Sequence, residues 1–441
     1  MSLPRMLRGF LVASALFTLL CLGSELVCYF ALHLAGPYDF PLLRTYYVRE
    51  HKLILFVDFH AFFDKFVFFH SRRFYTESIQ LSYPAPAVVA YKLFLVPTPR
   101  PNHGTGALAR FGAGLLGSSF LFSILWYQAL TRRGLNSASA ITLVVGTYLL
   151  SFGLWFELMQ GNIEWVVWVL LSIAVWSFCT SRFIPAACLI GIAGSMKIFP
   201  IIYLGLFLSI KRYRDAVLTL IAAAVATLAG LWLVCPDIPF SWHQTVLALT
   251  SFEREHVAGV RPGEVGFDHS LFALIKQVMT ACTGEQGSAS RPGLYLLVVA
   301  LGGTLLFFTR IRKLPVPNQV LCLGVAAILL PPVSYDYTLL HLYPAVVLLS
   351  LFAIHQAKSF RHAQQTGLWA ACLLLAFILS PQSELIWHGV RYAGQAKALA
   401  LLVLGGVALC CPFELPGLPT VQEGSYRTGK LLTAAPGKDP Q

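Results

Sequence analysis

The chain has 441 residues, of which 57% are hydrophobic and only 12% are charged, about half the charged share of a soluble globular protein. Its apolar residues form continuous runs of roughly 17 to 25, long enough to cross a bilayer, so the composition excludes an ordinary soluble protein. The net charge of +12 comes from Lys and Arg in short loops, as the positive-inside rule requires, and nucleic acid is not an expected partner.

The first apolar run, about 9–34, is expected to be an uncleaved membrane span. Arg5 and Arg8 precede it and predict a cytoplasmic N-terminus. We expect one transmembrane domain over 1–411, in which 35–104 and 235–291 form two large extracytoplasmic loops. The Gly-, Pro- and Lys-rich tail 412–441 is predicted to be disordered in the cytoplasm, together with the C-terminus.

The remaining apolar runs predict an all-α polytopic bundle of about 11 to 12 transmembrane segments. Residues 183–210 are expected to form two short half-helices that meet near Lys197, because basic residues on both flanks place both ends inside. Both large loops and the polar turns at 157–162 and 334–337 then share the extracytoplasmic face. Function is therefore expected there. The other predicted spans cover about 106–130, 137–157, 163–180, 215–234, 293–309, 317–333, 338–354, 367–381 and 396–411.

Two carboxylates, Asp58 and Asp64, lie among phenylalanines in a stretch that is expected to form an interfacial helix over 51–70. On such a helix His60 and Asp64 stand at i, i+4 and share a face. A carboxylate near an apolar wall has a raised pKa, which suits a general base, so Asp58 is the first candidate. The alternative is that both carboxylates are interfacial and solvated by lipid headgroups.

Lys197 is the second unusual residue, because an ammonium group within an apolar segment is costly unless it meets an anion or reaches water. It is a candidate phosphate-binding residue, and the alternative is a side chain that snorkels to the membrane surface. Asp336 and His341 flank the start of a late span, where the alternatives are a helix-capping Asp and a core histidine. Arg254 and Arg261 are candidate phosphate contacts that could equally meet lipid headgroups.

No Walker motif, GxGxxG or metal-ligand spacing is present in the sequence, so neither a cofactor nor a metal is predicted. The ten cysteines lie mostly inside apolar runs and are expected to be small core residues. Asp268 is expected to start a second interfacial helix, over 269–280.

A series of polar motifs recurs along the chain in a fixed order. They are DFHAFF at 58–63, Phe74-Tyr75, YPAP at 83–86, QGN at 160–162, KIFP at 197–200 with Arg212, and SYDY at 334–337 followed by HLYP at 341–344. Together these motifs resemble glycosyltransferase family 87, the polyprenol-phosphate-mannose-dependent mannosyltransferases with the GT-C fold, over roughly residues 50–350. An insertion-like segment at 36–50 leaves Asp39 as a rival to Asp58, and Ala85 stands where the family usually has a second proline.

The resemblance implies transfer of a sugar, mannose above all, from a polyprenyl-phosphate donor to a lipid or glycan acceptor, with inversion and without a metal. It implies a multi-pass enzyme of the plasma (inner) membrane whose active site is extracytoplasmic. Asp58 is the implied base, and the implied donor-phosphate ligands are Lys197, Arg254, Arg261 and His341. Supporting or acceptor-binding residues are His60, Asp64, Tyr83, Gln160, Asn162 and Asp336. The alternative function is a lipid or glycan transporter or flippase of envelope biogenesis.

Overall fold

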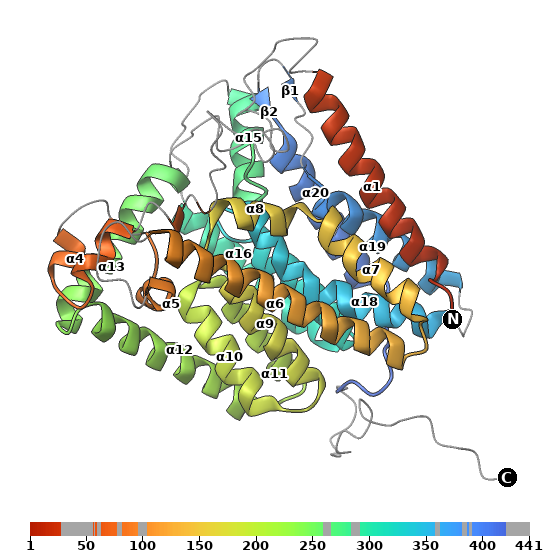
Figure 1. Ribbon diagram of the computed structural model, residues 1–441, viewed down its shortest axis with the longest axis horizontal. Helices are drawn as coiled ribbons and strands as arrows, with labels where there is room; N and C mark the ends of the chain where they lie inside the picture. The colour runs from red at the N-terminus through yellow and green to blue at the C-terminus, as the bar shows by residue number, and fades with distance from the viewer. Residues whose placement is uncertain are drawn as a thin grey trace.

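The computed structural model describes residues 1–27, 56, 58–59, 63–76, 82–95, 104–258, 266–283, 292–357, 362–381, 386–387 and 390–419. These residues form a bundle of helices that pack at several angles, with a single two-residue antiparallel ladder, β1 (Ile386–Trp387) with β2 (Val390–Arg391) (Figure 1). The predicted fold class, an all-α polytopic membrane protein, is confirmed.

The helices follow the apolar runs of the sequence. In chain order they are α1 (Arg5–Leu26), η3 (Phe63–Phe68), α4 (Arg73–Thr76), α5 (Ala85–Leu95), α6 (Gly104–Arg132), α7 (Ser137–Leu150), α8 (Phe152–Gln160), α9 (Glu164–Cys179), α10 (Phe183–Met196), η4 (Phe199–Leu204), α11 (Gly205–Ser209), α12 (Tyr213–Val234), α13 (Ile238–Phe252), η5 (Glu253–Ala258), α15 (Leu271–Thr283), α16 (Pro292–Thr309), η6 (Ile311–Lys313), α17 (Val316–Leu329), η7 (Asp336–Leu342), α18 (Tyr343–Gln356), α19 (His362–Leu379) and α20 (Ala393–Cys410).

Within the described residues, six helices are long and apolar enough to cross a membrane, and the bent pair α7 and α8 makes a seventh candidate. Six further apolar helices have only 10 to 17 residues, fewer than the roughly 20 that a perpendicular span needs. The predicted number of 11 to 12 segments depends on those shorter helices and stays a prediction.

The centre of the bundle is the segment made of η7 and α18. The span Asp336–Gln356 is 83% buried, whereas the outer spans α1, α6, α12 and α16 are 28% buried or less and expose apolar side chains. Helix α18 contacts α1, α6, α9, α17 and α19, so most of the bundle is arranged around it (Figure 1). An exposed apolar rim around a buried central helix is what a lipid environment requires, because lipid tails are as apolar as the core.

Two predicted helices differ from the observed elements. The span predicted over about 137–157 is formed by two helices, α7 and α8, between which the chain bends by 50°. The single helix predicted over 51–70 is wrong, because Phe63–Phe68 is a 3-10 helix that ends in a turn where His70 has φ +67°. In the described part of this stretch, Phe56, Phe59 and Phe66 are buried in the core, and Phe68 and Phe69 pack against it. We infer that this tertiary packing overrides a regular helical period.

The hairpin predicted around Lys197 is confirmed. Helix α10 ends at Met196, Lys197 has an extended backbone (φ −139°, ψ 129°), and the chain continues through η4 into α11. Helix α15 also matches the predicted helix after Asp268. The Oδ1 atom of Asp268 accepts hydrogen bonds from the backbone N–H groups of Ser270 (2.8 Å) and Ser334 (2.9 Å), which ties this helix to the start of η7.

The chain remains packed beyond α20. The Phe413 side chain is fully buried against Phe352, and its backbone N–H donates to Asn318 Oδ1 at 2.6 Å. The predicted tail 412–441 therefore does not begin as an unpacked segment, while 420–441 lie outside the described residues.

A buried ion pair joins α20 to the start of the central segment. Lys397 Nζ donates to Asp336 Oδ1 at 2.6 Å and to the Ser380 carbonyl at 2.9 Å, and the two charged side chains are only 2% and 5% exposed. Each charge is tolerated in the core only because the other compensates it. The pair therefore holds η7, the end of α19 and α20 together.

A left-handed glycine connects α8 to α9. Gly161 has φ +64°, and its backbone N–H donates to the Glu157 carbonyl at 2.7 Å, which closes the end of α8. A Cβ atom at this position would lie 2.7 Å from the Cα of Phe56. Only glycine satisfies both the backbone angle and this close approach.

We predict that Lys397→Met lowers the free energy of unfolding by about 3–5 kcal/mol, because it leaves the Asp336 carboxylate buried without its cation. Thermal unfolding in detergent measures this change. The double variant Lys397→Met/Asp336→Leu removes both charges and should recover a large part of the loss. Equal losses in the single and double variants would contradict an ion pair that acts as one unit.

We predict that Gly161→Ala destabilises the protein by about 1–3 kcal/mol, because alanine is strained at positive φ and its Cβ collides with Phe56. Gly117→Ala is the matched control, since Gly117 lies inside α6 with open space around it and alanine favours the helix there. The comparison of the two melting temperatures is the measurement. A Gly161 variant as stable as the Gly117 variant would refute the strain argument.

Candidate active site

Asp58 is held in place by the aromatic residues on either side of it. Phe59 is buried, and its ring stacks on Phe111 of α6 with ring centroids 4.6 Å apart. The Phe56 ring meets Phe111 edge-on at 5.4 Å, and the Phe56 backbone N–H donates to the Leu158 carbonyl of α8 at 3.4 Å. This anchoring leaves Asp58 half-buried beside the ends of α8 and α9.

Asn162 connects Asp58 to the neighbouring elements. Its Nδ2 atom donates to Asp58 Oδ2 at 2.9 Å and to the Tyr83 hydroxyl at 2.7 Å. Its Oδ1 atom accepts a hydrogen bond from the backbone N–H of Glu164, at 3.2 Å, in the first turn of α9. The Asn162 amide is thus oriented from both ends, and Asp58 receives a fixed donor.

Glu164 forms the centre of a buried charge cluster. Its Oε2 atom lies 3.0 Å from Lys197 Nζ, and its Oε1 atom lies 2.7 Å from His341 Nε2. The side chains of Glu164 and His341 are each 2% exposed, whereas Lys197 is 26% exposed. Lys197 is therefore the most exposed of these three side chains.

Two tyrosine rings flank the Lys197 ammonium. Its nitrogen lies 5.4 Å from the ring centre of Tyr83 and 5.3 Å from that of Tyr337, distances at which a cation is attracted to an aromatic face. With Glu164, these rings keep the Lys197 head inside the cluster. This arrangement differs from the alternative in which Lys197 extends to the membrane surface.

Burial raises the pKa of the Asp58 carboxyl above its ordinary value, while the Asn162 hydrogen bond and the charge of Lys197 act in the opposite direction. Asn162 is hydrogen-bonded to only one carboxylate oxygen. The other oxygen, Oδ1, makes no hydrogen bond to any described residue. A carboxylate with a raised pKa and an available oxygen has the properties of a general base.

A further carboxyl group lies within α8. Glu157 is fully buried, and the backbone N–H of Asn162 is a nearby donor to its carboxyl group. It interacts electrostatically with Glu164, Asp58 and Lys197. Glu157 is therefore a third carboxyl group near the cluster, beside those of Asp58 and Glu164.

The structure brings together five of the predicted site residues and leaves others apart. The group of five consists of Asp58, Tyr83, Asn162, Lys197 and His341. Asp336 instead pairs with Lys397, although its neighbour Tyr337 touches the cluster. Arg254 is exposed in η5 and has no described contact with these five, and Gln160 is half-exposed at the end of α8. His60, Arg261 and the rival Asp39 lie outside the described residues, as does the side chain of Asp64, whose backbone belongs to η3.

Sequence patterns did not single out Glu164, Glu157 or Lys397. Each is an ionisable residue next to or inside an apolar run, which is costly unless it is paired or used. That signal led to Lys197 and could equally have led to these three. The described residues hold no group of three or more His, Cys, Asp or Glu side chains that could bind a metal ion.

The family model of glycosyltransferase family 87 matches residues 83–334, which is more than half of the chain. The match includes Tyr83, Asn162, Glu164 and Lys197, while Asp58 lies 25 residues before it and His341 seven residues after it. No significant match is found among curated proteins or among solved structures. The chain belongs to glycosyltransferase family 87, and it is a multi-pass membrane glycosyltransferase.

Proposed function

We propose that this glycosyltransferase moves a sugar, mannose above all, from a polyprenyl-phosphate-linked donor to a hydroxyl group of a lipid or glycan acceptor. The observation that carries the proposal is a half-buried carboxylate with an available oxygen beside a Lys–Glu–His cluster. Asp58 supplies the carboxylate, and Lys197 and His341 flank Glu164. A base and cationic groups at one site are what transfer from a phosphate leaving group requires.

In the proposed reaction the acceptor oxygen attacks the anomeric carbon of the sugar as Asp58 removes the hydroxyl proton. The new bond joins the acceptor oxygen to that carbon, and the bond from the same carbon to the phosphate oxygen breaks. A single displacement of this kind inverts the configuration. Asp58 suits the role better than Glu164 because both Glu164 oxygens are already engaged.

Lys197 and His341 are proposed to stabilise the negative charge that develops on the departing polyprenyl phosphate. Lys197 is the more exposed of the two and can meet a phosphate oxygen without leaving Glu164. In a buried site such contacts are stronger than in water, because the local dielectric is lower. Glu164 then acts as a positioning residue that keeps both groups on one side of the donor.

The distribution of basic residues supports an extracytoplasmic site. Helix α9 runs from Glu164 in the cluster to the loop that holds Arg182, and α10 returns from that loop to Lys197. Helix α6 likewise runs from Phe111, beside Phe59, to Arg132. Arg132 and Arg182 thus lie at the ends opposite the cluster, where the positive-inside rule places the cytoplasm. We therefore propose the outer face of the plasma (inner) membrane for catalysis.

The transporter alternative is less well supported. A transporter places its ionisable residues near the middle of the bilayer at the junction of repeated halves. Here Asp58, Lys197 and Glu164 gather where helices α8, α9 and α10 end or begin. The family match also supports an enzyme.

We predict that Asp58→Asn abolishes transfer, with a loss of at least about 100-fold in kcat, because the acceptor loses its base. The assay incubates purified protein with synthetic polyprenyl-phosphate-mannose and candidate lipid acceptors and measures glycosylated product. Asp237→Asn is a control with the same change of charge. Asp237 pairs with Arg72 rather than with a residue of the candidate site, and asparagine can still cap α13.

The same assay is repeated with donors that carry other sugars on the same polyprenyl phosphate. Activity with glucose or arabinose but not mannose would replace the proposed sugar and keep the reaction. Transfer by the Asp58→Asn variant at the wild-type rate would refute the base assignment. Failure of the wild type with every polyprenyl-phosphate donor would refute the donor class.

We predict that Asn162→Ala moves the acidic limb of the kcat/KM profile to higher pH. The Asn162 hydrogen bond lowers the pKa of Asp58, so its loss raises that pKa further, and a base works only when it is deprotonated. Activity at low pH therefore falls more than activity at high pH. A loss of the same factor at every pH would show that Asn162 acts in some other way.

A further inference from the structure

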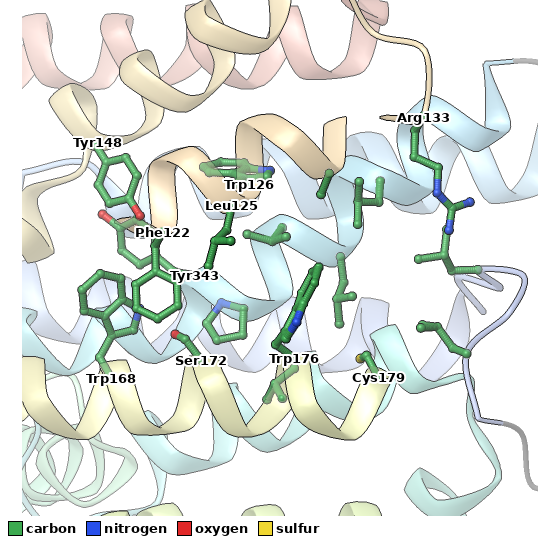
Figure 2. Close-up of a pocket in the computed structure, with 18 residues that line it drawn as sticks. Phe122, Leu125, Trp126, Arg133, Tyr148, Trp168, Ser172, Trp176, Cys179 and Tyr343 are labelled. Carbon is green, nitrogen blue, oxygen red and sulfur yellow. The ribbon is translucent and has the colours of Figure 1, made fainter. Parts of the chain in front are cut away.

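A cleft lies inside the bundle on the side of α9 and α18 away from the charge cluster. About 850 Å³ of space lies between its walls and on its open side. Figure 2 shows its lining of aromatic and aliphatic side chains, which come mostly from α6, α9 and α18. Leu415 and Leu418, from the segment after α20, also line it. Its walls are almost entirely apolar, so its occupant must be apolar along most of its length.

The cleft is accessible from the membrane. Leu125 of α6 and Trp176 of α9 line it and are 37% and 38% exposed, and they belong to the apolar surface of the bundle. An apolar chain can therefore enter sideways from the bilayer without crossing water.

The two ends of the cleft differ in chemistry. At one end Tyr343 stacks on Tyr148, with centroids 5.3 Å apart, and lies 5.8 Å from Trp168. Tyr343 follows His341 by two positions, so these rings separate the cleft from the charge cluster. At the other end lies Arg133, the one charged side chain of the lining (Figure 2).

Arg133 lies near the membrane surface opposite the active site. Helix α6 runs from Phe111, which contacts Phe59, to Arg132, a length of about 32 Å at 1.5 Å per residue. That length matches the roughly 30 Å thickness of the hydrocarbon core. The Arg133 side chain is half-buried, and among the described residues no carboxylate pairs with it. A guanidinium group in this position can bind a phosphate bidentately.

We propose that this cleft binds an anionic phospholipid of the leaflet opposite the active site, with the lipid phosphate on Arg133 and one acyl chain along α9 and α18. The chain runs towards the rings of Tyr343 and Trp168 and ends beneath the catalytic cluster. The charge at Arg133 and the apolar walls together match a lipid that carries a phosphate at one end of a long hydrocarbon chain.

The polyprenyl chain of the proposed donor is a poorer occupant. Its phosphate has to reach the cluster at Lys197, whereas the rings of Tyr148, Trp168 and Tyr343 close the cleft on that side. An occupant whose phosphate lies at Arg133 has its charged end a membrane thickness away from Asp58. The lipid site is therefore distinct from the donor site and does not depend on the proposed reaction.

The test compares Arg133→Gln with Arg132→Gln. The two arginines are adjacent and lose the same charge, but Arg132 is exposed at the end of α6 and does not line the cleft. Phosphatidylglycerol is titrated into detergent-purified protein, and binding is measured by native mass spectrometry and by the rise in melting temperature. The wild type and the Arg132 variant should bind alike, and the Arg133 variant should bind roughly fivefold more weakly.

Three further arms identify the occupant. Phosphatidylcholine with the same acyl chains should raise the melting temperature less than phosphatidylglycerol does. Glycerol 3-phosphate, which has no acyl chain, should not raise it. Ser172→Phe places a ring inside the cleft and should abolish protection while Arg133 is intact. If this variant does not fold, the arginine pair still decides the question.

Equal binding by the Arg133 and Arg132 variants would overturn the proposal, as would equal protection by phosphatidylcholine or by glycerol 3-phosphate. Displacement of phosphatidylglycerol by a lower concentration of polyprenyl phosphate, with the same dependence on Arg133, would assign the cleft to an isoprenoid chain instead.

Discussion

The contact of Glu164 with Lys197 and His341 is the constraint on which the candidate site depends. A carboxylate that is 2% exposed cannot remain charged in an apolar bundle without nearby cations or donors. Its two partners come from separate parts of the chain. Lys197 lies at the break between α10 and η4, and His341 lies in η7. The Glu164 carboxylate therefore fixes the relative positions of α9, the hairpin and η7. Moving any of these elements away would leave a charge in the apolar core without its partner.

The position of Asp58 relative to this cluster follows from backbone geometry and aromatic packing. The left-handed turn at Gly161 brings Asn162 to the start of α9, and its close approach to Phe56 leaves no space for a side chain. Phe59 then anchors the adjacent residue on Phe111. Rigid aromatic neighbours thus hold Phe56 and Phe59 on either side of Asp58, which gives this candidate carboxylate a defined place.

Polar and apolar groups occupy different parts of the bundle. Charged and hydrogen-bonding groups gather where α8, α9, α10 and η7 meet, and the Lys397–Asp336 pair connects η7 to α20. Beyond the rings of Tyr343 and Trp168, the interior becomes an almost purely apolar cleft. One bundle thus keeps its buried charges apart from the cleft, where a charge would have no partner.

The sequence by itself determined the membrane class, the hairpin around Lys197 and much of the site's membership. Asp58, Lys197 and His341 could be selected because polar groups in apolar surroundings are costly and therefore rare, whereas Tyr83 and Asn162 were selected through the family resemblance alone. Only the tertiary structure decided which groups pair with which. Glu164 pairs with Lys197 and His341, Asp336 pairs with Lys397, and Phe63–Phe68 forms a 3-10 helix where one regular helix was predicted. Pairing depends on distances between elements far apart in the chain, and a pattern of residue types carries no information about those distances.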